Sequence, residues 1–328
     1  MTDKKSSSSH RLPGVGALIK DSCSFYEKNL KALCLVGLLP VLFSAVMDLI
    51  SAGGHNVALS GREPFGGLFS FAFSIVVFMV SIVTPVVMIR TIKAIDDSKK
   101  LDLDASYASA FRIFWSILWV AILVGLSVFS GAVIFILPAI YLAIALTFAM
   151  YALALDGHHG IQALCTSFYY MHGNWWKVFW RLLIIGLVVG GAFLLAMAVV
   201  YAIMLLAGAP IGSAVVMRAF MYSHAHISLL ISIFFSAFTW LVVFPITYRI
   251  SYTLYASLKA HKPAPVPEND FKVSRNWFIG LPIFGVAVGY LYLSAIVISI
   301  FAVGFLNGYE RAAYSHRGVP IGMVRRTR

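Results

Sequence analysis

The longest run of the chain without a charged side chain extends from Ile113 to Leu155, between Arg112 and Asp156. One helix needs about 20 apolar residues to cross a hydrocarbon core of about 30 Å, so this run suits two antiparallel spans joined by a tight turn. Shorter uncharged runs recur elsewhere, and 60% of all residues are hydrophobic whereas 12% are charged. Because the alternating polarity of a membrane barrel is absent, the sequence predicts an all-α, polytopic transmembrane helical bundle.

The uncharged runs predict seven spans in a chain that divides into four parts. The expected spans are 33–51, 68–89, 114–135, 137–155, 178–206, 227–247 and 277–306. The expected parts are a disordered polar tail (1–14), a six-span membrane domain (15–262), a Pro-rich linker (263–275) and an accessory seventh span with a basic tail (276–328).

A loose repeat precedes the first, third and fifth spans. The three segments read SFYEKNLKALCLVGLL, SYASAFRIFWSILWVAIL and SFYYMHGNWWKVFWRLLIIGL. In each, aromatic residues and a serine lead through a basic residue into an apolar run, which is typical of an interfacial amphipathic helix. The sequence therefore predicts a six-helix core of three units, each an interfacial helix followed by a hairpin of spans, plus the seventh span.

The third of these interfacial segments shows the clearest helical period. Its apolar residues, which we expect to face lipid or the bundle, are Ile161, Leu164, Phe168 and Met171. Gln162 and Thr166 fall on the opposite side and are expected to face water. The segment is therefore predicted to lie along the cytoplasmic interface.

Positive charge is distributed unevenly between the connections. The net charge is +12, and Lys and Arg gather beside span ends, as in cytoplasmic loops of membrane proteins. This pattern predicts a bacterial inner-membrane protein with a cytoplasmic N-terminus, and with cytoplasmic connections at 90–112 and 259–275. Anionic headgroups are the expected partners of these clusters, rather than nucleic acid. With seven spans the basic C-terminal tail would lie outside, although Lys and Arg usually concentrate on the cytoplasmic side. Either this tail is translocated, or the last apolar run re-enters the membrane.

The three cysteines show no paired spacing. Cys23, Cys34 and Cys165 all fall on the predicted cytoplasmic half, where thiols stay reduced. We expect them to be packing residues.

One block of the chain resembles a known family. A Pro-led span ends at an Asp, and an Ala-x-x-x-Ser segment, a Gly-Asn-Trp turn and a basic residue then lead into another span. The residues that carry this pattern are Pro138, Asp156, Ala163, Ser167, Gly173, Asn174, Trp175 and Lys177. The block resembles the uncharacterised bacterial inner-membrane proteins that include YciC, and the related membrane domain of some glycerophosphodiester phosphodiesterases. The resemblance implies a six-helix membrane domain without an established activity.

Polar residues at or inside the spans are the candidates for a polar site. Asp156, His158 and His159 form the most polar cluster at a span end, either a proton or metal site or a turn with Asp156 as a helix cap. Adjacent histidines of a regular helix do not face one ion, which favours the cap. Asp48 is the acid deepest within an apolar run, and intramembrane acids are functional candidates.

Two other groups of residues suit contacts with lipid or with helices. An aromatic and basic belt at the start of the fifth span is expected to anchor the chain at the interface, or to recognise anionic lipid. Its members are Trp175, Trp176, Lys177, Trp180 and Arg181. Small-residue pairs that permit close helix packing are Gly186 with Gly190, and Gly285 with Gly289.

The function expected from this pattern is non-enzymatic. The sequence contains no nucleotide-binding, zinc-protease or serine-nucleophile motif, so no catalytic residue, metal or cofactor is assigned. We expect a scaffold or a role in envelope maintenance with lipid or protein partners, including a homo-oligomer formed through the last span. The alternative is a transporter or channel for a small or lipidic solute, which the prolines within the spans favour. A polar, water-accessible cavity near mid-membrane would support transport of a polar solute.

Overall fold

The computed structural model describes residues 13–58, 65–99, 101–206, 225–262, 274–291, 294–295 and 298–299. Within these residues the chain is helical and contains no strand, which confirms the predicted all-α class. The N-terminal tail to residue 12, most of the Pro-rich linker and the chain after residue 299 lie outside the described residues. The seventh span is therefore described only in part.

The order of elements follows the three predicted units. The first unit contains α1 (Val15–Lys28), α2 (Leu30–Ala58) and α3 (Phe65–Asp96). The second contains α4 (Leu103–Arg112), α5 (Phe114–Ile134), α6 (Ile136–Ala145) and α7 (Ala149–Asp156). The third contains α8 (Ile161–Met171), α9 (Trp175–Leu206), α11 (Ala225–Ala237), the π-helix η1 (Phe238–Val243) and α12 (Phe244–His261). Six helical stretches of the described chain are long and apolar enough to cross a membrane, as predicted for the core.

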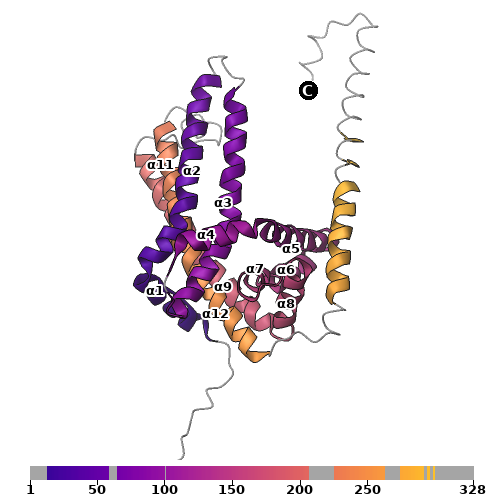
Figure 1. Ribbon diagram of the computed structural model, residues 1–328. Coiled ribbons are helices and arrows are strands. Elements are labelled where there is room, and N and C mark those ends of the chain that lie inside the picture. Colours follow the sequence, from indigo (N-terminus) through magenta and orange to yellow (C-terminus); the bar gives the residue numbers. More distant parts are fainter. Residues whose placement is uncertain are drawn as a thin grey trace, which may run out of the picture.

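The two hairpins of the first and second units run in different directions. Figure 1 shows α2 and α3 side by side, with α11 next to α2, whereas α5 and α6 run across the direction of the α2–α3 hairpin. The helix 274–291 stands apart from α2 and α3 and reaches the far end of α5. There, Ser130 Oγ of α5 donates a hydrogen bond of 2.5 Å to the Leu281 carbonyl oxygen.

The predicted fourth span is not one continuous helix. It divides into α6 and α7, with a turn at residues 146–148. The break removes the helical partner of the Ala145 carbonyl oxygen, and Ser167 Oγ of α8 donates to that oxygen at 2.7 Å. The stretch still has the length and apolar composition of a span, and a hydroxyl group from α8 stabilises its interruption.

A proline in α2 leaves a carbonyl oxygen without its helical partner. Pro40 has no N–H, so the carbonyl oxygen of Val36, four residues earlier, receives no bond from the proline. Tyr107 of α4 donates its hydroxyl to that oxygen at 2.8 Å. The interfacial helix of the second unit thus compensates for the proline of the first.

The same arrangement occurs at Pro245, near the start of α12. The missing N–H would have bonded the Leu241 carbonyl oxygen in η1, and Tyr26 of α1 donates its hydroxyl to it at 2.9 Å. Gly37 permits this contact between units, because a Cβ atom there would collide with the Trp240 carbonyl group of η1. Both tyrosines belong to the repeated aromatic segments of the sequence.

The third interfacial helix is not at the surface. α1 and α4 each bury few residues, whereas most of α8 is buried, including Ala163, Leu164 and Cys165. Gln162 is exposed as predicted, but Thr166 is only 2% exposed, so the prediction that it faces water was wrong. α8 lies among α5, α6, α7 and α12, which cover the side expected to be wet.

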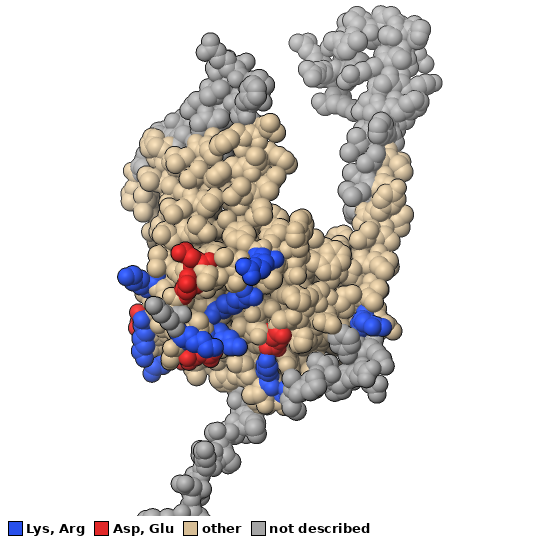
Figure 2. All heavy atoms as spheres, in the orientation of Figure 1, with Lys and Arg blue, Asp and Glu red and all other residues tan. Residues whose placement is uncertain are grey.

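Charged residues gather at one end of the molecule. Figure 2 shows Lys, Arg, Asp and Glu on the lower half of this face, around α1, α4 and the end of α12. The described surface above them on the same face consists of uncharged residues, which suits contact with lipid tails.

Candidate functional site

A cavity of about 1200 Å³ lies between α6, α8, the start of α9 and the helix 274–291. Its walls are mainly apolar. α6 contributes Leu137 and Tyr141, α8 contributes Phe168, and the helix 274–291 contributes Trp277 and Leu281. The ring of Phe168 meets Phe278 edge-on at 5.6 Å between centroids, which joins α8 to the helix 274–291. The cavity is therefore enclosed partly by the segment outside the predicted six-span domain.

The first tryptophan of the predicted belt belongs to this cavity. Trp175 Nε1 donates to the Tyr141 carbonyl oxygen at 3.2 Å. Its ring stacks on Tyr141 at 5.4 Å and on Phe179 at 5.1 Å between centroids. Trp176 also lines the cavity, whereas Trp180 lies outside it; both side chains are exposed. The belt thus divides into a cavity wall and an outward surface.

Of the two basic members of the belt, Arg181 bonds backbone carbonyl groups and Lys177 bonds a side chain. Arg181 Nε donates to the Pro13 carbonyl oxygen at 2.8 Å, and its Nη1 donates to the Lys177 carbonyl oxygen at 2.6 Å. Lys177 Nζ donates to Asn174 Oδ1 at 3.4 Å. The Arg181 contact with Pro13 joins α9 to the segment just before α1.

The charge at the cavity comes from Lys262, which the sequence analysis assigned only to a cytoplasmic connection. Its ammonium donates to the carbonyl oxygens of Tyr169 at 2.6 Å and His172 at 2.7 Å, at the end of α8. It also lies 4.7 Å from the centre of the Tyr169 ring. Among the described residues that line the cavity, no carboxylate is present.

Asp156, from the predicted polar cluster, is part of an ion pair between helices. Its carboxylate accepts from the Tyr255 hydroxyl at 2.6 Å and from Lys259 Nζ at 2.5 Å, and its side chain is 9% exposed. The prediction that it caps a helix was wrong, because α8 begins after Gly160 without a side-chain cap. The partners on α12 lie about a hundred residues along the chain, beyond any local pattern.

The two adjacent histidines lie in the turn between α7 and α8. Gly157 ends α7 with a φ of 71°, a left-handed conformation that favours glycine. His158 is half-buried and His159 is exposed. In the part of the chain that the structure describes, no group of three or more His, Cys, Asp or Glu residues is arranged to hold a metal.

Asp48 has a partner on another helix. Ser232 Oγ of α11 donates to Asp48 Oδ2 at 2.5 Å. The contact joins α2 to α11 and satisfies one oxygen of a carboxylate that an apolar environment would otherwise penalise.

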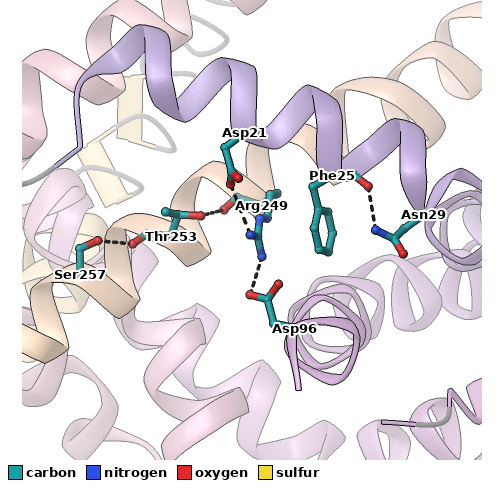
Figure 3. A network of polar contacts seen from close by, with 7 residues as sticks. All are labelled: Asp21, Phe25, Asn29, Asp96, Arg249, Thr253 and Ser257. Carbon is teal, nitrogen blue, oxygen red and sulfur yellow. Dashed lines mark hydrogen bonds and ion pairs between the residues drawn. The ribbon is translucent and has the colours of Figure 1, made fainter. Parts of the chain in front are cut away.

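A charged cluster around Arg249 joins three helices that are far apart in sequence (Figure 3). Arg249 of α12 contacts Asp96 at the end of α3 at 2.5 Å and Asp21 of α1 at 3.3 Å. Its guanidinium lies 4.0 Å from the centre of the Phe25 ring, and the Arg249 side chain is 12% exposed. We call Asp21, Asp96 and Arg249 the clamp. No local pattern in the sequence indicates this cluster, because Asp96 and Asp21 lie 153 and 228 residues away from Arg249.

The predicted glycine pairs differ in their surroundings. A Cβ atom at Gly285 would collide with Ser130 of α5, and one at Gly289 would touch Phe129. No atom lies within 4 Å of the Cβ position at Gly186 or Gly190. The glycines of the last span therefore accommodate a helix of the same chain, whereas the α9 pair faces open space.

The cysteines of the described chain are free thiols within packed surroundings. Burial raises the pKa of the Cys165 thiol, which lies in the core formed by α8 and its neighbours. Cys34 Sγ lies 3.7 Å from the Tyr26 hydroxyl. This geometry suits the predicted packing role.

Comparisons with known proteins give no relative for this chain. No family model, curated protein or solved structure matches it. Membership of the family that includes YciC therefore stays a prediction.

Proposed function

We propose that this chain is a non-enzymatic protein of a bacterial cytoplasmic membrane that binds a lipidic amphiphile in the cavity beside α8. Such binding would serve a scaffolding or envelope-maintenance role. The observation that carries the proposal is the cavity of about 1200 Å³ with its largely apolar walls.

The size and lining of the cavity favour a lipid over a polar metabolite. Pockets for small molecules usually measure about 300–1,000 Å³, so this one suits a larger ligand. Each Å² of apolar surface removed from water contributes about 25 cal/mol, whereas a polar group buried without partners is penalised. A ligand with a long apolar part gains most from these walls.

The proposed orientation places the cavity near the cytoplasmic interface. The Lys262 end of the cavity lies where α8 and α12 end, and charged residues gather at this end of the molecule (Figure 2). Basic residues concentrate on the cytoplasmic side of membrane proteins. α1, the first described helix, lies at the same end (Figure 1), and a cytoplasmic N-terminus is part of this proposal.

Co-purified lipid provides the test. We expect native mass spectrometry of the full chain, released from detergent, to show a retained lipid. Replacing Ile140 or Leu281, which line the cavity, with Trp should reduce that lipid several-fold by filling the space. The control is Leu187→Trp, at an exposed position of α9 outside the cavity. Equal lipid retention in all variants, with equal thermal stability, would show that the lipid binds elsewhere.

The same cavity also supports the alternative that the chain transports a lipidic solute. A transporter reconstituted in vesicles would move a fluorescent lipid between leaflets, and Ile140→Trp would slow that movement. A binding protein would retain the lipid without moving it. The apolar walls give no comparable support to transport of a polar solute.

A further inference from the structure

We infer that the phosphate group of an anionic phospholipid binds to Arg90 and Arg112, where α3, α4 and the end of α7 meet. Neither arginine lines the cavity beside α8. The inference therefore goes beyond the proposed function and does not depend on what the cavity binds.

Arg90 is a half-buried arginine whose described partners are uncharged. Its Nη1 donates to Ser109 Oγ of α4 at 3.0 Å, and its Nε donates to the Ala154 carbonyl oxygen, in the last turn of α7, at 3.4 Å. In the part of the chain that the structure describes, Arg90 forms no ion pair. Its Nη2 has no hydrogen-bond partner there and is not among the buried atoms without a partner, so this nitrogen reaches the surface.

The arginine of the clamp shows what Arg90 lacks. Arg249 is also largely shielded from solvent, and it meets the carboxylates of Asp21 and Asp96. A charge removed from water is penalised unless an opposite charge compensates for it. A guanidinium group presents paired N–H donors that match the oxygens of a carboxylate or a phosphate. The free side of Arg90 therefore suits an oxyanion that the described chain does not supply.

The surroundings of Arg90 do not neutralise its charge. Acids on or next to the adjoining helices already have cationic partners: Asp96 is paired with Arg249, Asp97 with Lys99 and Asp156 with Lys259. Asp104, in the first turn of α4, lies about 12 Å along that helix from Arg112. The end of α7 carries about −0.5 elementary charge, which compensates for a full positive charge only in part.

Arg112 provides a second cation on the same face of α4 as Ser109. The two residues are three positions apart, so their side chains are neighbours on the helix surface. Arg112 is exposed, and it forms no ion pair within the described residues. Because Arg90 bonds Ser109 directly, both arginines border one stretch of the α4 surface.

Two exposed tryptophans indicate that the phosphate belongs to a lipid. Trp115 and Trp119 follow Arg112, lie one turn apart on α5, and are 77% and 53% exposed. A Cβ atom at Gly160 would lie 3.4 Å from Trp119 Cδ1, so this face of α5 adjoins the turn after α7. Tryptophan concentrates where lipid headgroups meet acyl chains. A phospholipid can thus place its phosphate at the arginines and its glycerol region against the tryptophans.

Competition between two phospholipids tests the site on the full chain in detergent. The protein is incubated with equal amounts of phosphatidylglycerol and phosphatidylcholine, and the bound lipids are counted by native mass spectrometry. We expect phosphatidylglycerol to exceed phosphatidylcholine about fivefold, because the choline group offsets the phosphate charge that the arginines bind. Inorganic phosphate at the same concentration should displace neither lipid.

Substitution of the two arginines tests their roles. Arg90→Gln should abolish the about fivefold preference, and Arg90→Lys should restore only part of it, because lysine keeps the charge but not the paired donors. Arg112→Gln should lower the preference without changing the melting temperature, so the site remains testable if Arg90→Gln proves unstable. Lys28→Gln removes a charge at an exposed position of α1 and should change neither quantity.

The outcomes separate this inference from the proposed function. If Arg90→Gln and Arg112→Gln alter the preference no more than Lys28→Gln, the phosphate does not bind here and the inference is wrong. If inorganic phosphate displaces the phosphatidylglycerol, the site binds a free oxyanion and the lipid assignment is wrong. Ile140→Trp, in the cavity, should lower the total bound lipid and leave the preference intact. Loss of the preference in that variant, with its retention in Arg90→Gln, would place the anionic lipid in the cavity instead.

Discussion

The two ends of α12 each carry a cation, and the structure uses them differently. Arg249 near its start lies in the clamp, between the carboxylates of Asp21 and Asp96 and over the Phe25 ring. Lys262, just after its end, bonds the carbonyl groups of α8 and borders an apolar cavity. Both positions lie at the charged end of the molecule.

The difference concerns how the charge is neutralised. In the clamp two carboxylates face one guanidinium, so the cluster leaves little attraction for a ligand and instead joins α1, α3 and α12. At the cavity the ammonium of Lys262 bonds two carbonyl oxygens at the end of α8. The comparison predicts that changes in the clamp alter stability, whereas changes at the cavity alter binding.

Replacing Arg249 should have the largest effect. Arg249→Ala leaves two partly exposed carboxylates without their partner and removes the contact with Phe25. Each such ion pair contributes up to about 1 kcal/mol, and the cation–π contact about 1 kcal/mol more. We expect a strongly lowered melting temperature in detergent, with lipid binding retained by the protein that remains folded. Arg112→Ala, at an exposed position of α4, is the control and should cost less than about 0.5 kcal/mol. Equal melting temperatures for the two variants would refute the clamp.

Ser167→Ala should have the next largest effect and should affect both regions. The Ala145 carbonyl oxygen would lose the Ser167 hydroxyl, and a buried acceptor without a partner costs about 2 kcal/mol. Because α6 and α8 both line the cavity, lipid retention should also fall. The control Ser74→Ala removes an exposed hydroxyl that bonds only its own helix. If stability falls but lipid retention does not, the break between α6 and α7 does not affect the cavity.

Tyr107→Phe should cost about 1 kcal/mol, because the Val36 carbonyl oxygen loses its hydroxyl partner. A double-mutant cycle with Pro40→Ala sharpens the test. Alanine restores the N–H that can bond Val36, so Tyr107→Phe should cost clearly less in that background. Additive effects of the two substitutions would mean that the tyrosine does not compensate for the proline. Lipid binding should stay unchanged, as for the clamp.

The smallest predicted effect is a dependence of stability on pH that comes from Tyr26 and acts only at alkaline pH. Burial raises the pKa of Tyr26 to about 12, and its hydrogen bond with Cys34 adds to the increase. The ordinary value is about 10, so the contribution to stability is complete below pH 10 and is lost as the pH rises toward 12. Melting temperatures of the wild type should therefore fall more steeply over this range than those of Tyr26→Phe. Parallel curves would contradict a protonated, buried hydroxyl.

Local sequence was sufficient for the elements because their signals are local. The uncharged runs predicted the six helical stretches of the described chain that are long enough to span a membrane, and the aromatic segments predicted the short helices α1, α4 and α8. The length of an apolar run, compared with the thickness of the bilayer, and the helical period of 3.6 residues in its apolar positions are both properties of one continuous segment. The repeated order of one short helix and then a hairpin was predicted from the same local patterns.

The environment of each element depended on segments far away in the chain. Thr166 has the helical position of a water-facing residue, yet α8 is covered by α5, α6, α7 and α12. Asp156 resembles a cap in sequence, yet Tyr255 and Lys259 bind it. Tyr26 and Tyr107 carry no local sign that they compensate for Pro245 and Pro40.

The sequence by itself determined that the chain is a helical membrane protein, which residues share a helix face and where charge accumulates. Only the tertiary structure decided which faces are covered, which charges are neutralised and that a cavity remains beside Lys262. The physical reason is the separation along the chain between the residues that interact. Helix formation depends on residues within a few turns. Burial, ion pairing and enclosed volume depend on contacts between distant units, such as that between Asp21 and Arg249, which are 228 residues apart.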